Sequence, residues 1–353
     1  MTKERRNRIV NTLIVLMILV VLSTIGILIW QVSNDPKEPP AVSITTTTTV
    51  TTTVTTTTSR YPQAATRLTE TVQLAQSEQM TAKNVILLDA KQQVMLAELG
   101  ADTEIAPASM TKIMTLVVAM ETLTPAQLEG AAVISNEQLK PLIEIGASRV
   151  GYVGGEAVCV RDLLYGTILP SGADAAVTLA CYTAGTVDEF VKLMNEKAEE
   201  IGLSHTHFCN PTGLDEDGHY STVHDIARLL EYAMSIPECK AILSTPTYMT
   251  AATTEHSTGI ELKSIVFMRL GDKKIENVKL EGGKTGFTNH AGQCLASWAT
   301  DCDGNTYVCV VAGCEEQLDP IYNTLTIYDR YTYCAAKTYS RPVVTTDAEQ
   351  IHS

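Results

Sequence analysis

The sequence of 353 residues lacks the short motifs that indicate a bound metal. Its nine cysteines include no Cys-x-x-Cys pair with zinc spacing, and its seven histidines form no His-Glu-x-x-His motif. An odd, scattered set of cysteines also argues against a disulfide framework in a domain of this size. We therefore expect no metal and no cofactor, with most cysteines buried as small apolar residues. An exported location would still permit one or two disulfide bonds.

Basic residues are also few. The chain contains 26 Lys and Arg against 40 Asp and Glu, and its net charge of −14 argues against nucleic acid as a partner. Residues 1–8 hold a charge of +3 (Lys3, Arg5, Arg6 and Arg8 against Glu4), which leaves −17 for the remainder. The hydrophobic content of 45% is enough for a substantial core.

One long apolar run follows this basic start. Residues 9–30 carry no formal charge and would span about 33 Å as a helix, which is enough to cross a bilayer. The run is longer than the core of a secretory signal peptide, and no Ala-x-Ala-like site follows it. We therefore favour an uncleaved transmembrane signal anchor in residues 1–30 over a cleaved signal peptide. The positive-inside rule places the N-terminus in the cytoplasm and the rest of the chain outside the cell.

Residues 31–65 are predicted to form an extended extracellular stalk, because they combine prolines with twelve threonines in residues 43–59. One α+β domain is expected over residues 66–338, with a polar tail at 339–353, since strands at both ends with helices between favour that class. Strands are predicted at residues 84–89, 94–99, 278–288, 293–300 and 306–313. Helices are predicted at residues 67–79, 109–123, 161–168, 175–184, 187–201, 223–234 and 319–337, with a loop-like stretch at 124–160.

Ser109 and Lys112 lie three residues apart at the start of a predicted helix. Pro107 and Ser109 favour a helix start, and the residues that follow are largely apolar. Positions i and i+3 share one face of a helix, so the amine can reach the hydroxyl. Desolvation or a second cation would lower the lysine pKa from about 10.4 and free its lone pair. The pair would then act as a nucleophilic serine with a lysine base.

A Ser-x-x-Lys match also arises by chance, and an isolated one more often marks a capping serine and a solvated lysine. Two further stretches bear on it. Ser171 lies in a glycine-containing turn between predicted helices, where its hydroxyl could be presented to a ligand. Lys284, followed by Thr285 and Gly286 on a predicted strand, offers a cation for a substrate carboxylate. Gly286 lets a ligand approach the backbone closely, and a strand edge offers N–H groups for an oxyanion.

The order Ser-x-x-Lys, Ser-Gly-x, Lys-Thr-Gly resembles the three-part pattern of the low-molecular-weight penicillin-binding proteins, which are serine-type D-Ala-D-Ala carboxypeptidases. The resemblance runs from about residue 84 to 337. Besides the short motifs it includes G-A-S-R-V-G at 146–151, D-L-L-Y-G at 162–166, L-P-S-G at 169–172, N-P-T-G-L at 210–214, H-Y-S-T at 219–222 and G-K-T-G-F-T at 283–288. It implies a β-lactamase/transpeptidase-like fold, in which helices flank an antiparallel sheet.

The resemblance also implies roles for the catalytic residues. Ser109 would attack the carbonyl between two D-alanines of a peptidoglycan stem peptide, and the last D-alanine would leave. Lys112 would take the hydroxyl proton, and Ser171 would pass a proton to the leaving amine. Water would then hydrolyse the acyl-enzyme, while β-lactams would trap the serine covalently. The protein would work at the bacterial cytoplasmic membrane, with its catalytic domain outside.

Residues 284–288 would bind the substrate. Lys284 and Thr285 would hold the terminal carboxylate of the peptide. The backbone N–H groups of the nucleophile and of Phe287 would form the oxyanion hole, and Gly286 and Thr288 complete the substrate-binding stretch. No metal takes part in the chemistry that the resemblance implies.

The sequence departs from the family in one motif, because Ala173 stands where relatives usually carry asparagine. An alternative is therefore a catalytically impaired penicillin-binding or wall-binding protein, and a DD-endopeptidase or β-lactamase of the same fold is another. A zinc carboxypeptidase using His205, His207, His219 and His224 is disfavoured by the missing His-Glu-x-x-His motif. Many relatives carry a second, β-rich domain and a C-terminal amphipathic anchor, and here the N-terminal anchor and stalk would take the anchor's place.

Overall fold

The computed structural model describes residues 66–77 and 80–332. The predicted membrane helix at 9–30, the whole predicted stalk at 31–65 and the polar tail at 339–353 lie outside the described residues. Within the described ranges, no helix is long and apolar enough to cross a membrane. The description below concerns the α+β domain alone.

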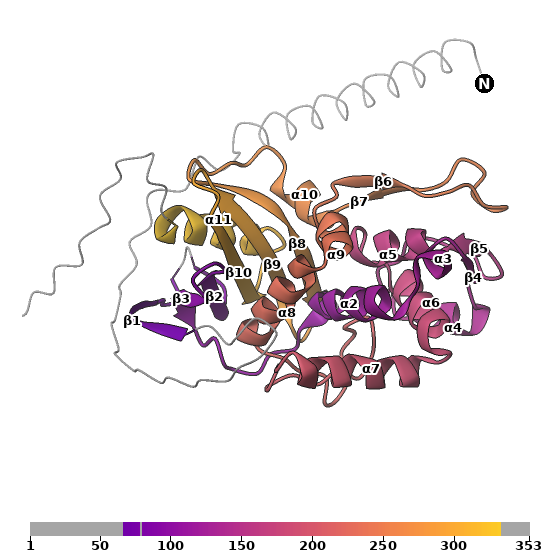
Figure 1. Ribbon diagram of the computed structural model, residues 1–353, viewed down its shortest axis with the longest axis horizontal. Coiled ribbons are helices and arrows are strands. Elements are labelled where there is room, and N and C mark those ends of the chain that lie inside the picture. The colour runs from indigo at the N-terminus through magenta and orange to yellow at the C-terminus, as the bar shows by residue number, and fades with distance from the viewer. Residues whose placement is uncertain (1–65, 78–79, 333–353) are drawn as a thin grey trace, which may run out of the picture. The chain divides into compact units, whose positions relative to one another are not determined.

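A six-stranded sheet forms the centre of the domain, with the order β1-β3-β2-β10-β9-β8 (Figure 1). β10 pairs antiparallel with both β9 and β2, so the last strand of the chain joins the first hairpin to the final meander. This arrangement confirms the predicted α+β class. The strands are β1 Thr66–Gln73, β2 Asn84–Asp89, β3 Val94–Leu99, β8 Val278–Thr288, β9 Gly292–Asp301 and β10 Thr306–Cys314.

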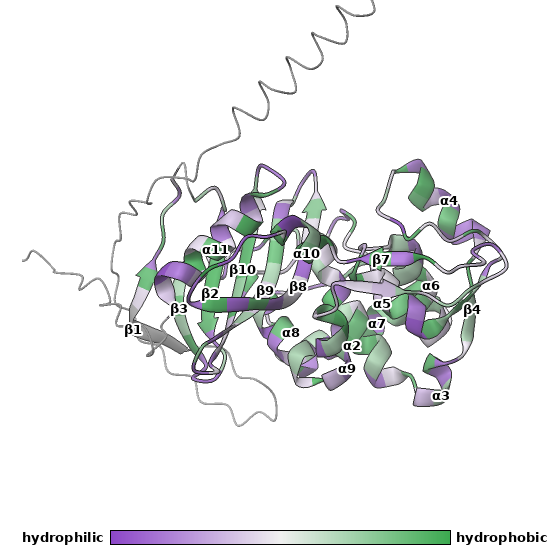
Figure 2. Cartoon of the chain, turned by 90° about the horizontal axis from the view of Figure 1, so that it is seen from above, coloured by the Kyte–Doolittle hydropathy of each residue, from purple (hydrophilic) through white to green (hydrophobic). Residues whose placement is uncertain are grey.

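Helices cover both faces of the sheet. Alternate residues of β10 point to opposite sides, so Val308 and Val310 join one core cluster while Cys309 and Val311 join the other. The larger cluster packs against α2 and α8, and the smaller one packs against α10 and α11 (Figure 1). Figure 2 shows hydrophobic colouring along β2, β10 and α2, as expected for elements buried on more than one side. The 3₁₀ turn and the helices are η1 Ala108–Thr111, α2 Lys112–Thr122, α3 Pro125–Leu128, α4 Asn136–Glu144, α5 Val160–Ile168, α6 Ala173–Ala184, α7 Val187–Glu200, α8 Val223–Ser235, α9 Pro237–Leu243, α10 Ile265–Leu270 and α11 Asp319–Tyr331.

The predicted helix at 67–79 is wrong, because its first half is strand β1. β1 pairs parallel to β3, and the Thr71 hydroxyl donates to the carbonyl of Met95 at 3.0 Å. The sheet is therefore antiparallel except at this edge, in contrast to the fully antiparallel sheet that was expected. β-branched residues such as Thr69, Thr71 and Val72 fit a strand better than a helix, which explains the outcome.

The stretch at 124–160 is not loop-like. It contains α3, α4 and a small antiparallel sheet of β4 Ala131–Val133 and β5 Ala157–Cys159. Both helices begin at capping residues, since Thr124 forms a capping box with Gln127 and Ser135 accepts from the backbone of Gln138. Residues 235–277, for which no element was predicted, hold α9, α10 and the hairpin of β6 Thr247–Met249 and β7 Glu261–Lys263.

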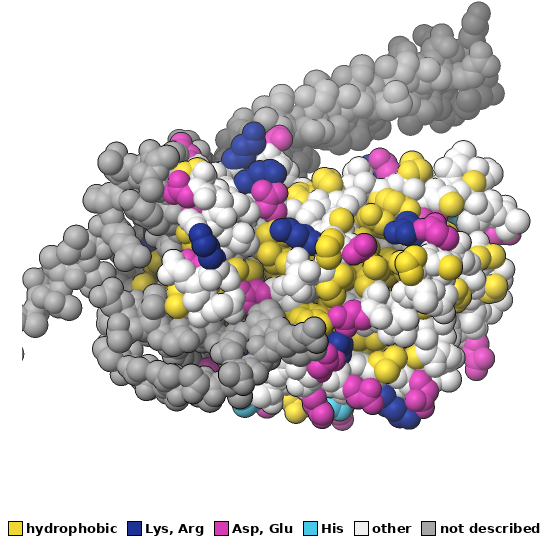
Figure 3. Space-filling model, in the orientation of Figure 1, with side chains coloured by type: hydrophobic (Ala, Val, Ile, Leu, Met, Phe, Trp, Pro, Cys, Tyr) yellow, Lys and Arg dark blue, Asp and Glu magenta, His cyan; other side chains and the backbone are white. Residues whose placement is uncertain are grey.

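The cysteines bear out the expectation only in part, since four of the eight described ones are buried. Cys302 is disulfide-bonded. The other seven described cysteines are free, and four of these are buried: Cys239, Cys294, Cys309 and Cys314. Figure 3 shows Lys and Arg side chains scattered among acidic ones on the face in view, in keeping with the negative net charge.

We expect Asn323→Ala to destabilise the domain, because Asn323 ties α11 to the chain that enters β2. Its side-chain oxygen accepts from the N–H of Ala82 at 3.0 Å, and its nitrogen donates to the carbonyl of Asp319 at 2.9 Å, in a buried position. A buried donor left without a partner costs about 1–3 kcal/mol. The melting temperature should fall by several degrees in thermal unfolding.

The matched control is Asn277→Ala. Asn277 also donates to α11, at the carbonyl of Asp329, but on the surface. A surface substitution of this kind should change stability by about 0.5 kcal/mol or less. An equal loss of stability in both variants would contradict the role given to Asn323.

Candidate active site

Ser109 lies in η1, and Lys112 is the first residue of α2. In a 3₁₀ turn, residues three apart lie directly above one another, which brings the two side chains together. The Lys112 Nζ lies 2.9 Å from the Ser109 Oγ and donates to the carbonyl of Thr212 at 2.6 Å. The structure therefore has the predicted Ser-x-x-Lys contact, although a 3₁₀ turn, and not an α-helix, makes it.

Burial controls the protonation of Lys112. The side chain is almost fully buried, and this desolvation lowers the pKa of Lys112 to about 7, while the carboxylate of Asp174 acts in the opposite direction. A substantial fraction of the amine is then neutral near neutral pH. A neutral amine can donate to Thr212 and still accept a proton from the Ser109 hydroxyl.

Lys284 is the second buried amine of the site. It lies on β8, the edge strand of the sheet, and its Nζ donates to the Ser171 Oγ and to the carbonyl of Thr285, both at 2.9 Å. Burial lowers the pKa of Lys284 well below its ordinary value, and the cations of Lys112 and Arg269 lower it further. The hydrogen bond between Lys284 and Ser171 therefore joins the Lys-Thr-Gly motif to the Ser-Gly-x motif.

Ser171 is held in an unusual backbone conformation between α5 and α6. Its φ angle is 62°, in the left-handed region that residues other than glycine rarely adopt. Ala108, next to Ser109, has a φ angle of 47°. Such strain is found at functional sites, where the surrounding structure fixes a side chain in one position.

β8 packs directly against η1. A Cβ atom added at Gly286 would lie 3.1 Å from the Ala108 Cβ and 3.3 Å from the Ser109 nitrogen, so a larger residue would crowd the nucleophile's backbone. Further along the strand, Phe287 is half exposed, and the Thr288 hydroxyl donates to Asp215 at 2.6 Å. The residues predicted to bind substrate thus lie along the edge strand beside the serine.

The loop at 210–214 was missed as part of the site, although its sequence was noted in the resemblance. The Asn210 side chain accepts from the N–H groups of Thr212 and Gly213, which fixes the turn that aims the Thr212 carbonyl at Lys112. Gly213 has a φ angle of 76°, and a Cβ atom there would lie 1.8 Å from the carbonyl oxygen of Ala108. The Asn-Pro-Thr-Gly turn was the sequence signal that could have identified this loop.

Arg269 on α10 was also missed. Its charge contributes to lowering the pKa of Lys284, and its Nη1 donates to the Gln293 side chain at 3.1 Å. Its Nε is buried and has no hydrogen-bond partner among the described residues. No motif surrounds Arg269 in the sequence, and only packing of α10 near β8 places it here.

Ala173 is buried at the start of α6, and its N–H donates to the carbonyl of Ser148 at 2.7 Å. The N-cap residue of α6 is Gly172. The Asp174 carboxylate accepts from the N–H groups of Val150 and Gly151, at 2.9 and 3.0 Å. It therefore fixes the loop that precedes α5 against the start of α6.

The histidines of residues 66–77 and 80–332 do not form a metal centre. In the part of the chain that the structure describes, no group of three His, Cys, Asp or Glu side chains could hold a metal ion. His224 contacts Asp102, and His219 is buried against Thr111 and the backbone of Cys209. This arrangement disfavours the zinc alternative.

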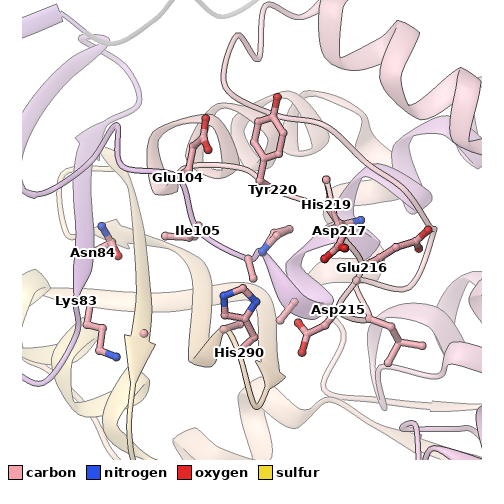
Figure 4. A pocket seen from close by; sticks show the side chains of 18 residues that line it. Lys83, Asn84, Glu104, Ile105, Asp215, Glu216, Asp217, His219, Tyr220 and His290 are labelled. Carbon is pink, nitrogen blue, oxygen red and sulfur yellow. The ribbon is translucent and has the colours of Figure 1, made fainter.

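A cavity of about 530 Å³ lies next to η1, the turn that holds Ser109 (Figure 4). Its lining includes Ala108, Gly213, His219 and His290, but none of the four side chains that carry the Ser-Lys and Lys-Ser contacts. The hydrogen bonds described above, and not this cavity, therefore define the candidate active site.

The profile of the D-alanyl-D-alanine carboxypeptidase family (Peptidase_S11) matches residues 70–315. The chain is 32% identical over 219 residues to the D-alanyl-D-alanine carboxypeptidase DacF of Bacillus subtilis, covering 62% of this chain and 54% of that protein. It is 29% identical over 225 residues to a D-alanyl-D-alanine endopeptidase of Pseudomonas aeruginosa, covering 63% of this chain and 68% of the relative.

The Streptomyces K15 DD-transpeptidase is similar in structure. The TM-score is 0.64 at 27% identity, and the match covers 72% of this chain and 98% of the transpeptidase. The chain spans little more than half the length of DacF. The family profile nevertheless covers most of the domain, including every motif of the candidate site. The chain therefore belongs to the D-alanyl-D-alanine carboxypeptidase family.

Proposed function

We propose that this protein is a serine D-Ala-D-Ala carboxypeptidase that removes the terminal D-alanine from peptidoglycan stem peptides. The observation that carries the proposal is the 2.9 Å contact between the Ser109 Oγ and a buried Lys112 whose pKa is lowered to about 7. A lysine in this state can act as a base at neutral pH. Family membership supplies the substrate class.

Acylation would begin with proton transfer from Ser109 to the neutral amine of Lys112. The serine oxygen then bonds to the carbonyl carbon of the penultimate D-alanine, and the resulting oxyanion accepts hydrogen bonds from the N–H groups of Ser109 and Phe287. The C–N bond breaks when Ser171 passes a proton to the leaving amine, which releases D-alanine. Water hydrolyses the ester and restores the serine.

The terminal carboxylate would be held by Lys284, Thr285 and Arg269. Because Lys284 donates to Ser171, the carboxylate would be bound beside the group that protonates the leaving amine. An anion next to Lys284 stabilises its charged form, and a charged Lys284 disfavours a proton on Lys112. Substrate binding would therefore increase the fraction of Lys112 that is ready to act as a base.

Two alternatives rest on specific observations. The similarity to an endopeptidase leaves open cleavage of cross-linked peptides by the same chemistry. Ala173 in place of asparagine favours a catalytically impaired penicillin-binding or wall-binding protein, since alanine offers no side-chain hydrogen bond. Loss of a donor used in the transition state costs about 2.7–4 kcal/mol, or 10²–10³ in rate.

We expect Ser109→Ala to abolish both D-alanine release and covalent labelling by a fluorescent penicillin, because the variant has no nucleophile. Release of D-alanine from a D-Ala-D-Ala peptide and gel fluorescence measure the two activities. Ser204→Ala, at an exposed serine away from the site, is the matched control and should keep both. D-alanine release by Ser109→Ala, or its inhibition by a chelator, would refute the proposal.

The Ala173→Asn variant separates the alternatives in the same assay. An active native protein that forms a long-lived penicilloyl adduct supports the carboxypeptidase, whereas rapid penicillin turnover indicates a β-lactamase. If the native protein releases no D-alanine and Ala173→Asn restores release, the impaired-protein alternative is correct.

The rate of acylation should rise with pH through about 7 and then level off. Lys112 must be unprotonated to accept the serine proton, and its unprotonated fraction increases as the pH passes its lowered pKa. Stopped-flow labelling with a fluorescent penicillin between pH 5.5 and 8.5 would measure this rise, the acidic limb of the pH–rate profile.

Glu231 provides the control for this profile. Burial also raises the pKa of Glu231 to about 7, so this carboxyl group could produce a limb at the same pH. Glu231→Gln removes that titration and should leave the limb in place. A limb that disappears in Glu231→Gln, or a flat profile in the native protein, would exclude Lys112 as its source.

We also propose that residues 1–30 anchor the protein in the cytoplasmic membrane as a single-pass signal anchor, with residues 31–65 as a stalk. The disulfide at Cys302 supports an oxidising location for the domain. The protein should remain in the membrane fraction after an alkaline carbonate wash, which strips peripheral proteins. N-terminal sequencing that begins near residue 31 would instead indicate a cleaved signal peptide and a secreted form.

A further inference from the structure

We propose that His219 is a positioning residue for the nucleophile, because it donates a hydrogen bond to Thr111 between Ser109 and Lys112. This inference rests on the proposed function and adds to it a residue that does not touch the substrate. The histidine belongs to the loop that follows Gly213, so it is distant in sequence from the turn that it holds.

The tautomer of His219 follows from its two partners. The N–H of Cys209 donates to the Nδ1 at 3.0 Å, so Nδ1 is an acceptor and carries no proton. The proton of the neutral ring is therefore on Nε2, which lies 2.9 Å from the Thr111 Oγ1 and donates to it. The contact with Thr111 is buried, and the ring of Phe208 packs edge-on at 5.8 Å.

The ring stays neutral over the range in which the enzyme would work. Burial lowers the pKa of His219 to about 4, the neighbouring His207 adds to this effect, and Asp215 acts in the opposite direction. A neutral ring can accept at one nitrogen and donate at the other, whereas a protonated ring could not accept from Cys209. The arrangement therefore favours a fixed donor toward Thr111.

The contact that Thr111 makes helps to fix the position of η1, the turn that holds Ser109. Neither η1 nor α2 has a side-chain cap, and Ala108 is in the left-handed region. The turn is instead held from outside by side-chain contacts such as that of His219 with Thr111. A small rotation of η1 would change the 2.9 Å separation of the Lys112 Nζ and the Ser109 Oγ, and catalysis is sensitive to such misplacement.

His219 also lies in the lining of the 530 Å³ cavity, where Figure 4 shows it on the same side as Asp217 and Glu216. The ring therefore contacts Thr111 on one side and the cavity on another, and Ala108 of η1 also lines that cavity. The ring contacts Thr111 but neither Ser109 nor Lys112, so it acts through the turn and not on the reacting atoms.

Two substitutions test the two hydrogen bonds separately. The amide of asparagine lies near the position of Nδ1, so His219→Asn keeps an acceptor for Cys209 but loses the donor to Thr111. The amide of glutamine reaches the position of Nε2, so His219→Gln keeps that donor. We expect His219→Asn to slow penicillin acylation by about threefold to tenfold, the effect of one lost hydrogen bond, and His219→Gln to stay within about twofold.

Thr111→Val removes the acceptor of the same bond and should slow acylation as much as His219→Asn. The double variant should be no slower than either single variant, because only one interaction is lost. These substitutions should lower the rate of the acylation step. They should leave the affinity of the preceding non-covalent binding of penicillin unchanged, since Lys284 and Thr285 hold its carboxylate. His224→Asn, at a histidine paired with Asp102, is the matched control and should not slow acylation.

Melting temperatures of all variants separate positioning from folding. Slowing that appears in His219→Asn but not in His219→Gln, at similar melting temperatures, supports the inference. Equal slowing in both variants with an equal loss of stability indicates a structural role and overturns it, as does unchanged acylation in His219→Asn when the native protein is labelled. A native protein that penicillin does not label overturns the proposed function and this inference together.

Discussion

The cost of charging two buried amines in one site governs the chemistry available to this protein. Lys112 and Lys284 are both nearly inaccessible to water, and this burial lowers the pKa of each amine. The Lys112 cation lowers the pKa of Lys284 further. Each amine is held by one hydroxyl and one backbone carbonyl, and no carboxylate is among these hydrogen-bond partners. The site can therefore keep one lysine as a base and reserve the other for an anionic ligand.

Close backbone contacts make this arrangement possible. Gly213 approaches the carbonyl of Ala108, and Gly286 approaches the nitrogen of Ser109, so the loop and the edge strand both press on the nucleophile's turn. The left-handed conformations of Ala108 and Ser171 are tolerated because buried elements surround them. The loop at 210–214 and β8, which are far apart in the sequence, are thus packed against the turn that holds Ser109, and covalent catalysis as proposed would depend on such proximity.

The sequence predicted those parts of the site that depend on local patterns. β8 was expected at residues 278–288 and occupies Val278–Thr288, and its first residues alternate between buried and more exposed positions. The Ser109–Lys112 contact was predicted from the spacing of the two residues together with the family resemblance. Arg269, Asp174 and His219 could not be assigned, since their roles arise from packing between distant elements. β1 was taken for a helix because its strand state depends on pairing with β3, which no local pattern reveals.

The effect of Ala173 can be located from the hydrogen bonds around Lys112. An asparagine at this position could bond both the lysine amine and an amide of the substrate. In this structure the amine is already oriented by the Thr212 carbonyl at 2.6 Å and by Ser109 at 2.9 Å, neither of which involves residue 173. The loop that faces it is held by Asp174. The observed hydrogen bonds of Lys112 therefore do not depend on residue 173. Under the proposed mechanism, the hydrogen bond that Ala173 cannot make would be one to the substrate, and its loss would alter substrate fit more than the ability to form an acyl-enzyme.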